Sequence, residues 1–160
     1  MNESRRAVIE RFYRDFARLD GVAMQAAYAP DARFDDEVFT LQGAQQIGAM
    51  WRMLCDATKA RPDSLAHWTL ETRDITDHSA HWEARYRFSA TGRAVHNHID
   101  AEFEFDPDGL ISRHRDRFDF PAWSRQALGW LGLLLGWTPM LRNRVRAQAA
   151  ANLQRYVARH

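Results

Sequence analysis

The chain has 160 residues, of which 46% are hydrophobic and 27% are charged, and its formal net charge is +1 at pH 7. This composition predicts one globular domain with a sizeable core and excludes an intrinsically disordered chain. A net charge near zero gives no general attraction to nucleic acid, and no motif that reads RNA or DNA is present, so we expect no nucleic-acid partner. The single cysteine, Cys55, excludes an internal disulfide.

The charges are divided unevenly along the chain. Residues 121–160 hold six arginines and no acidic residue, and all 21 acidic residues lie in residues 1–120. This asymmetry predicts that the tail contacts an acidic surface, which is the body of the protein, a partner subunit or a membrane. A charged helix begins at once at the N-terminus, without the apolar region of a signal peptide, so we expect a cytoplasmic protein.

The first third of the chain predicts three helices. Ser4 can cap a helix whose apolar residues recur at intervals of three and four, and Asp20 can cap a shorter one that Pro30 ends. Residues 32–39 follow as a short strand or extended turn. A third amphipathic helix then continues to about Ala60.

The middle of the chain predicts an antiparallel meander. Residues 65–76 and 80–91 read as strands, the second with clean alternation of apolar and charged side chains. Residues 95–120 read as two strands joined by the turn 106–109, Asp-Pro-Asp-Gly. Helices followed by a meander predict an α+β domain in which the helices pack on one face of a curved antiparallel sheet.

The character of the sequence changes after Pro121. Residues 123–141 are strongly apolar but contain three glycines, and the stretch is too short and interrupted for a membrane span, which needs about 20 apolar residues. We interpret it as a lid or dimer-packing element, or as a segment that lies on a membrane surface between arginines. A last helix is predicted over residues 142–157. Residues 1–120 therefore form the α+β domain, and residues 121–160 form an apolar and Arg-rich helical extension.

Three stretches carry a family resemblance: YAPDARFDDEVF, then LQGAQQIGAMW, then HNHIDAEFEFDPDGLISRHRDRFDF. They resemble the superfamily of nuclear transport factor 2, ketosteroid isomerase and the SnoaL-like polyketide cyclases, over residues 4–120. The resemblance implies a cone-shaped, cystatin-like fold whose pocket takes a small, largely apolar carbonyl-type molecule without a cofactor. The superfamily holds isomerases, cyclases, hydrolases and noncatalytic carriers, so the fold does not give the function. We also expect a homodimer, because a curved sheet leaves a large convex face to cover.

The resemblance and the strand pattern together predict a group of residues that could perform acid–base chemistry. In ketosteroid isomerases the general-base Asp lies in the extended acidic segment after the second helix; Asp36 matches that place, with Asp35 as its competitor. Counted from Gly109, the pocket-facing positions of the last strand include His114 and Asp116, and the alternation agrees. Facing Asp36 across a pocket, this pair could perform general acid–base catalysis. The alternatives are a structural His–Asp pair at the pocket rim and a turn cap at Asp36.

The other isomerase roles match less closely. Ketosteroid isomerases carry a tyrosine on the first helix, and the matching position in this chain is nearest Phe12, with Tyr13 one residue away. The position of the isomerase's second Asp, counted back from Phe103, corresponds to Ala101 in this chain. Asp100 would therefore enter the pocket only with a strand bulge, whereas the alternation directs Asn97 inward. The residues that we expect to contact a ligand are Tyr13, Tyr28, Trp51, Trp82, Tyr86, Asn97, Asp100 and Phe118.

The histidines do not predict a metal site. They show no zinc-protease spacing. His96 and His98 face outward on the predicted strand and would need further ligands.

Overall fold

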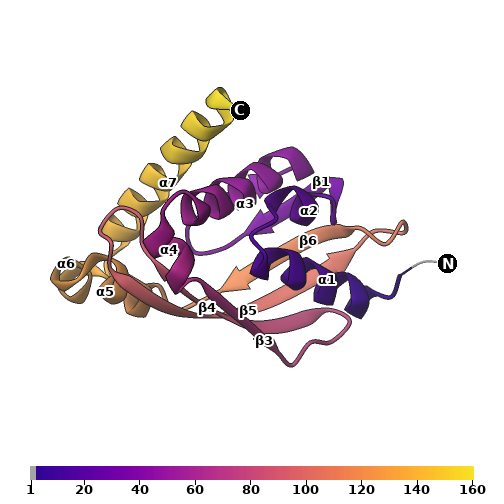
Figure 1. Ribbon diagram of the computed structural model, residues 1–160, viewed down its shortest axis with the longest axis horizontal. Helices are drawn as coiled ribbons and strands as arrows, with labels where there is room; N and C mark the ends of the chain where they lie inside the picture. The colour runs from indigo at the N-terminus through magenta and orange to yellow at the C-terminus, as the bar shows by residue number, and fades with distance from the viewer. Residues whose placement is uncertain (1–2) are drawn as a thin grey trace.

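The computed structural model describes residues 3–160, and in this part of the chain helices pack with a six-stranded sheet (Figure 1). Two helices precede the first strand, two lie between the second and third strands, and three follow the last strand. The helices are α1 (Arg5–Ala17), α2 (Gly21–Gln25), α3 (Ala44–Lys59), α4 (Pro62–His67), α5 (Phe120–Leu128), α6 (Trp130–Leu135) and α7 (Pro139–Arg159). The strands are β1 (Tyr28–Asp35), β2 (Thr40–Gln42), β3 (Thr69–Arg73), β4 (Ser79–Arg87), β5 (Ala94–Phe105) and β6 (Ile111–Arg117).

The polar caps predicted for the first two helices are confirmed. Ser4 Oγ accepts a hydrogen bond from the Ala7 amide, and Asp20 Oδ1 accepts one from the Ala23 amide, so each satisfies an N–H that the helix itself leaves unpaired. The prediction that Pro30 ends the second helix is wrong. The helix stops at Gln25, and Pro30 lies within β1, which shows a register irregularity in this region.

The sheet has the strand order β2-β1-β6-β5-β4-β3. Strands β3 to β6 form the predicted antiparallel meander, in which each strand pairs with the next. One pairing departs from the expected antiparallel pattern, because β1 lies parallel to β6. That contact joins residues about 80 positions apart in sequence, so local alternation could not reveal it; it places the end of β1 beside the end of β6.

The core lies between the sheet and helices α1 to α3. Phe12 of α1, Phe34 of β1 and Ile99 of β5 are almost fully buried there. Alternation on β6 follows the prediction, since His114 and Asp116 are buried whereas Arg113 and Arg117 are exposed. The face that carries the large apolar side chains therefore also carries two ionisable residues.

The C-terminal segment closes on this core rather than extending from it. Figure 1 shows α5 and α6 at one end of the sheet and α7 running from there beside α3. Leu153 of α7 joins the main core, and Arg146 donates hydrogen bonds to the Glu37 carbonyl (3.0 Å) and to Thr40 Oγ1 (2.9 Å). The predicted last helix begins slightly earlier, at Pro139, and ends at Arg159. No helix within residues 3–160 combines the length and the apolar character needed to cross a membrane.

Helix α6 folds back tightly on α5 at Gly132, where an added Cβ would overlap the carbonyl oxygen of Ser124. We expect Gly132→Ala to lower the free energy of unfolding by about 1–3 kcal/mol, because a backbone contact cannot move as a flexible side chain can. Leu133→Ala, at an exposed position of the same helix, is the control and should stay close to the parent. Urea unfolding followed by tryptophan fluorescence measures both, and equal stability of the two variants would contradict this packing.

Candidate functional site

A cavity of about 800 Å³ lies between the inner face of the sheet, α3 and the C-terminal helices. Its walls are mostly apolar, with Trp51 and Met50 on α3 and Trp82 and Ile99 on the sheet. A few polar side chains reach it, which is the usual composition of a small-molecule site. They include Asp36, Tyr86, Asn97, Asp116, Arg144 and Gln148.

Asp36 lies in the turn that connects β1 to β2. Its Oδ1 accepts hydrogen bonds from the amides of Val38 (2.7 Å) and Phe39 (2.6 Å), so the carboxyl group shapes the turn as well as lining the cavity. Within residues 3–160 its other oxygen, Oδ2, has no hydrogen-bond partner. One side chain therefore fills the turn-capping role and still offers an oxygen to a ligand.

The environment of Asp36 favours its protonated form. Burial raises the pKa of this carboxyl group to about 7, against the opposing effect of the Phe39 and Val38 amides. The negative charge of Asp116 raises the pKa further, and the nearby Arg146 lowers it. A carboxyl group in this condition exchanges a proton near neutral pH, as a general acid or base must.

Asp116 is held by a buried chain of hydrogen bonds. Trp51 Nε1 donates to the Tyr28 hydroxyl (3.0 Å), which lies 2.7 Å from His114 Nδ1, and His114 Nε2 lies 2.8 Å from Asp116 Oδ1. His114 has no exposed surface, and Asp116 is 3% exposed. The chain links α3, β1 and β6 and ends at the cavity, where Asp116 is its terminal member.

A consistent assignment of hydrogens follows from the groups in this chain. A carboxylate only accepts, so His114 Nε2–H donates to Asp116, and Nδ1 is left to accept from the Tyr28 hydroxyl. Tyr28 in turn accepts from Trp51. Each of these donors then has an acceptor. The second oxygen of Asp116 has no hydrogen bond in the described part of the chain and is free for a ligand.

The register places Asp36 and Asp116 side by side rather than across the cavity. Asp35 of β1 is the register partner of Arg115 of β6. Because the two strands are adjacent and parallel, the next residues, Asp36 and Asp116, lie at the same end of the pair. The expectation that the two acids face each other from opposite walls is therefore wrong. The arrangement is a pair of neighbouring carboxyl groups, in which the charge of one disfavours ionisation of the other.

Five of the residues predicted to contact a ligand line the cavity. They are Trp51, Trp82, Tyr86, Asn97 and Phe118. Three predicted site residues, Tyr13, Tyr28 and His114, lie behind the lining instead. Tyr28 and His114 belong to the hydrogen-bond chain, and the buried Tyr13 hydroxyl has no partner within residues 3–160.

Asp100 does not reach the cavity. Its side chain is 80% exposed on the outer face of the sheet, with Oδ1 2.9 Å from His81 Nδ1. The irregularity in β5 falls between Glu104 and Phe105, so nothing reverses the alternation at Asp100. The bulge that would have turned Asp100 inward is therefore absent from its part of the strand.

The C-terminal segment contributes cavity residues that the core pattern did not predict. Leu131, Leu135 and Leu141 line the cavity. Trp123 Nε1 on α5 donates a hydrogen bond to the Tyr86 hydroxyl on β4 (2.9 Å) and so joins the extension to the sheet. Burial raises the pKa of Tyr86 to about 12, so the hydroxyl stays protonated. The long apolar run after Pro121 is the sequence feature that could have predicted these cavity residues. Its interpretation as a lid is consistent with their position.

Residues 9–114 match the family described as SnoaL-like domain. The chain belongs to that family. No curated protein is detectably similar in sequence.

Solved structures share the fold of this SnoaL-like chain at low sequence identity. A candidate polyketide cyclase from Pseudomonas putida KT2440 has 15% identity and a TM-score of 0.59, over 79% of this chain and 99% of that one. A candidate polyketide cyclase from Xanthomonas campestris has 18% identity and a TM-score of 0.55, over 76% and 96%. A nuclear transport factor 2-like protein of unknown function from Burkholderia pseudomallei K96243 has 18% identity and a TM-score of 0.59, over 78% and 98%.

The raised pKa of Asp36 predicts a specific pH dependence of stability. The folded pKa, about 7, exceeds the ordinary value of 3.8, so the native state keeps a proton that the unfolded state loses between these values. The free energy of unfolding should therefore fall as pH rises from about 4 to about 7. Asp36→Asn should remove this fall, gaining on the order of 2 kcal/mol relative to the parent between pH 5 and pH 8, allowing for the partial exposure of the residue.

Urea unfolding at a series of pH values measures this effect. Asp35→Asn is the matched control, because Asp35 is adjacent in sequence but does not line the cavity. Parallel pH profiles for the parent and Asp36→Asn would contradict the raised pKa.

Proposed function

We propose that this SnoaL-like chain binds a small, largely apolar carbonyl-type molecule in its cavity and catalyses an acid–base isomerisation, cyclisation or hydrolysis without a cofactor. The observation that carries the proposal is the adjacent pair Asp36 and Asp116 in an apolar cavity, each with one oxygen that has no hydrogen-bond partner among residues 3–160. The candidate polyketide cyclases among the structural neighbours are consistent with such a ligand.

The two carboxyl groups suit different roles. Asp116 accepts the His114 N–H at one oxygen, and its second oxygen is placed to take a proton from carbon or from water. Asp36 holds a proton near neutral pH and can give it to a developing oxyanion. The Tyr86 hydroxyl accepts from Trp123, so its own O–H remains available to a ligand oxygen. His114 and Tyr28 act as positioning residues, because they touch Asp116 or its support but not the cavity.

Turnover of cyclic enones, epoxides and polyketide-like β-diketones tests the proposal. For a substrate that is turned over, Asp36→Asn and Asp116→Asn should each lower kcat by about 10²–10⁴-fold, the usual range for loss of a general acid or base. Asp35→Asn should keep the parent rate. Turnover that survives both cavity substitutions, or that is lost with Asp35→Asn alone, would contradict the assignment.

A second candidate function is a noncatalytic carrier that takes its ligand from an anionic membrane surface. The observation that favours it is the exposed apolar surface around α6, with Trp130 72% and Trp137 75% exposed. Leu133, Leu134 and Met140 are also exposed there. Residues 121–160 carry six arginines and no acid, which complements anionic headgroups. Since Leu131 and Met140 also line the cavity, an apolar molecule could pass directly between lipid and pocket.

Cosedimentation with vesicles tests this candidate. The chain should bind vesicles that contain phosphatidylserine, bind pure phosphatidylcholine more weakly, and release from the former at high salt. Trp130→Ala with Trp137→Ala should weaken binding at least tenfold, whereas Val22→Ala, at an exposed apolar position on α2, should not. Absence of vesicle binding would contradict it. If the double variant instead lowers the oligomer size in solution, the surface packs between two copies, in line with the predicted homodimer.

A further inference from the structure

A second cluster of ionisable residues lies on the face of the sheet opposite the cavity lining. It comes from two paired strands, with His81 and Glu83 on β4 and His96 and His98 on β5. The register places Glu83 directly opposite His98, and His81 opposite Asp100. Because residues two apart share a face of a strand, all of these side chains project from the same side of the sheet.

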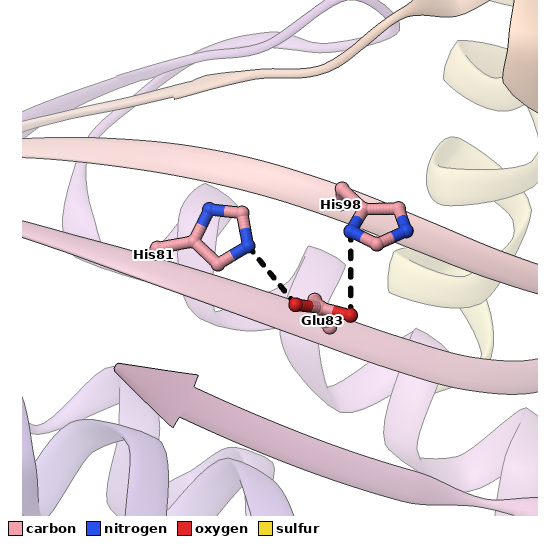
Figure 2. Close-up of side chains that lie close together, drawn as sticks. All are labelled: His81, Glu83 and His98. Atoms are coloured by element: carbon pink, nitrogen blue, oxygen red, sulfur yellow. Dashed lines mark hydrogen bonds and ion pairs between the residues drawn. The ribbon is translucent and has the colours of Figure 1, made fainter. Parts of the chain in front are cut away.

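Three of these residues bring metal-binding atoms close together. The potential ligand atoms of His81, Glu83 and His98 all lie within 4.8 Å of one another. Figure 2 shows both imidazoles directed at the Glu83 carboxylate, with His81 Nε2 3.2 Å from Oε2 and His98 Nδ1 3.3 Å from Oε1. His96 Nε2 lies 2.8 Å from the same Oε1.

The contacts of His81 indicate that its Nε2 faces a position suited to a cation. Its Nδ1 lies 2.9 Å from Asp100 Oδ1, and a carboxylate there requires the N–H on Nδ1 when the imidazole is neutral. The Nε2 lone pair then points toward the same place as the Glu83 oxygen. Arg73 Nη2 supplies a positive charge to both, at 3.3 Å from Nε2 and 3.5 Å from Oε2. The Arg73 side chain is 64% exposed and can withdraw into solvent.

We propose that His81 Nε2, the Glu83 carboxylate and His98 Nδ1 form a binding site for a divalent transition-metal ion of the Zn²⁺ type. Two imidazoles and one carboxylate are a ligand set that Zn²⁺ accepts, with water in the fourth position. Asp100 then orients His81 through its other ring nitrogen, the arrangement that commonly supports a metal-bound histidine. His96 is placed to hold the Glu83 carboxylate through its contact with Oε1.

The spacing of the histidines along the sequence did not reveal this site, and the expectation of no metal site followed from that spacing. His96 and His98 are two ligands at most on one strand, and the others come from a strand more than ten residues earlier. Only the β4–β5 register brings the set together. The site stands on the outer face and uses none of the cavity residues, so it is independent of the proposed function.

Titration calorimetry of the full, tag-free chain with Zn²⁺ alone tests the proposal. We expect one Zn²⁺ per chain, with affinity that falls as the pH is lowered, because protons compete with the metal for the same ligand atoms. Glu83→Gln and His98→Ala should each weaken binding at least tenfold. His78→Ala is the matched control, because His78 is an exposed histidine in the turn before β4, and it should leave binding unchanged.

Arg73→Ala gives a second readout that does not depend on damaging the cluster. Removal of the competing guanidinium should tighten Zn²⁺ binding, by about threefold to tenfold for a charge of this exposure. Co²⁺ should give the visible absorption of a nitrogen- and oxygen-bound ion in the parent and lose it in His98→Ala. The proposal is overturned if the parent binds no Zn²⁺, if Glu83→Gln and His98→Ala bind as the parent does, or if Arg73→Ala weakens binding.

Discussion

The buried hydrogen-bond chain from Trp51 through Tyr28 and His114 to Asp116 constrains the rest of the structure. Its members come from α3, β1 and β6, and none of the three linked side chains behind Asp116 has appreciable contact with water. Removing one member would leave a buried polar group without a partner, at a cost of about 1–3 kcal/mol. The chain therefore requires α3 to lie over β1 and β6, and it requires β1 and β6 to lie side by side.

The parallel contact of β1 and β6 then determines the chemistry of the cavity. It brings Asp36, in the turn after β1, next to Asp116 at the end of β6. The turn itself is fixed from both sides, by the Asp36 carboxyl group within it and by Arg146 of α7 from outside. As a result the C-terminal extension does more than cover the cavity, because it also holds the segment that carries Asp36. Burial, and to a smaller extent the negative charge of Asp116, raise the pKa of Asp36 to about 7.

The sequence predicted those features that depend on local pattern. The caps at Ser4 and Asp20, the meander and the inward direction of His114 and Asp116 follow from spacing and alternation, and the structure confirms them. Features that depend on distant pairing were not predictable in this way.

Three particular residues show why local pattern was insufficient. Tyr28 lies in β1, in the stretch before Pro30 that was expected to be helical, because its own register partner, Ile111, is more than 80 residues later. His114 was assigned to the cavity, because alternation gives the face of a strand but not the depth at which a side chain ends. Sequence spacing gives no sign of a metal ligand at Glu83, because two of its histidine neighbours, His96 and His98, lie on another strand.

The most direct test of this account is a ¹³C NMR titration of the aspartate carboxyl groups. We expect Asp36 to titrate with a pKa of about 7 in the parent, and we expect this pKa to fall in Asp116→Asn, where the neighbouring negative charge is gone. An Asp36 resonance that titrates near the ordinary aspartate value of about 4, or one that Asp116→Asn leaves unchanged, would contradict the claim that the two carboxyl groups act as a pair.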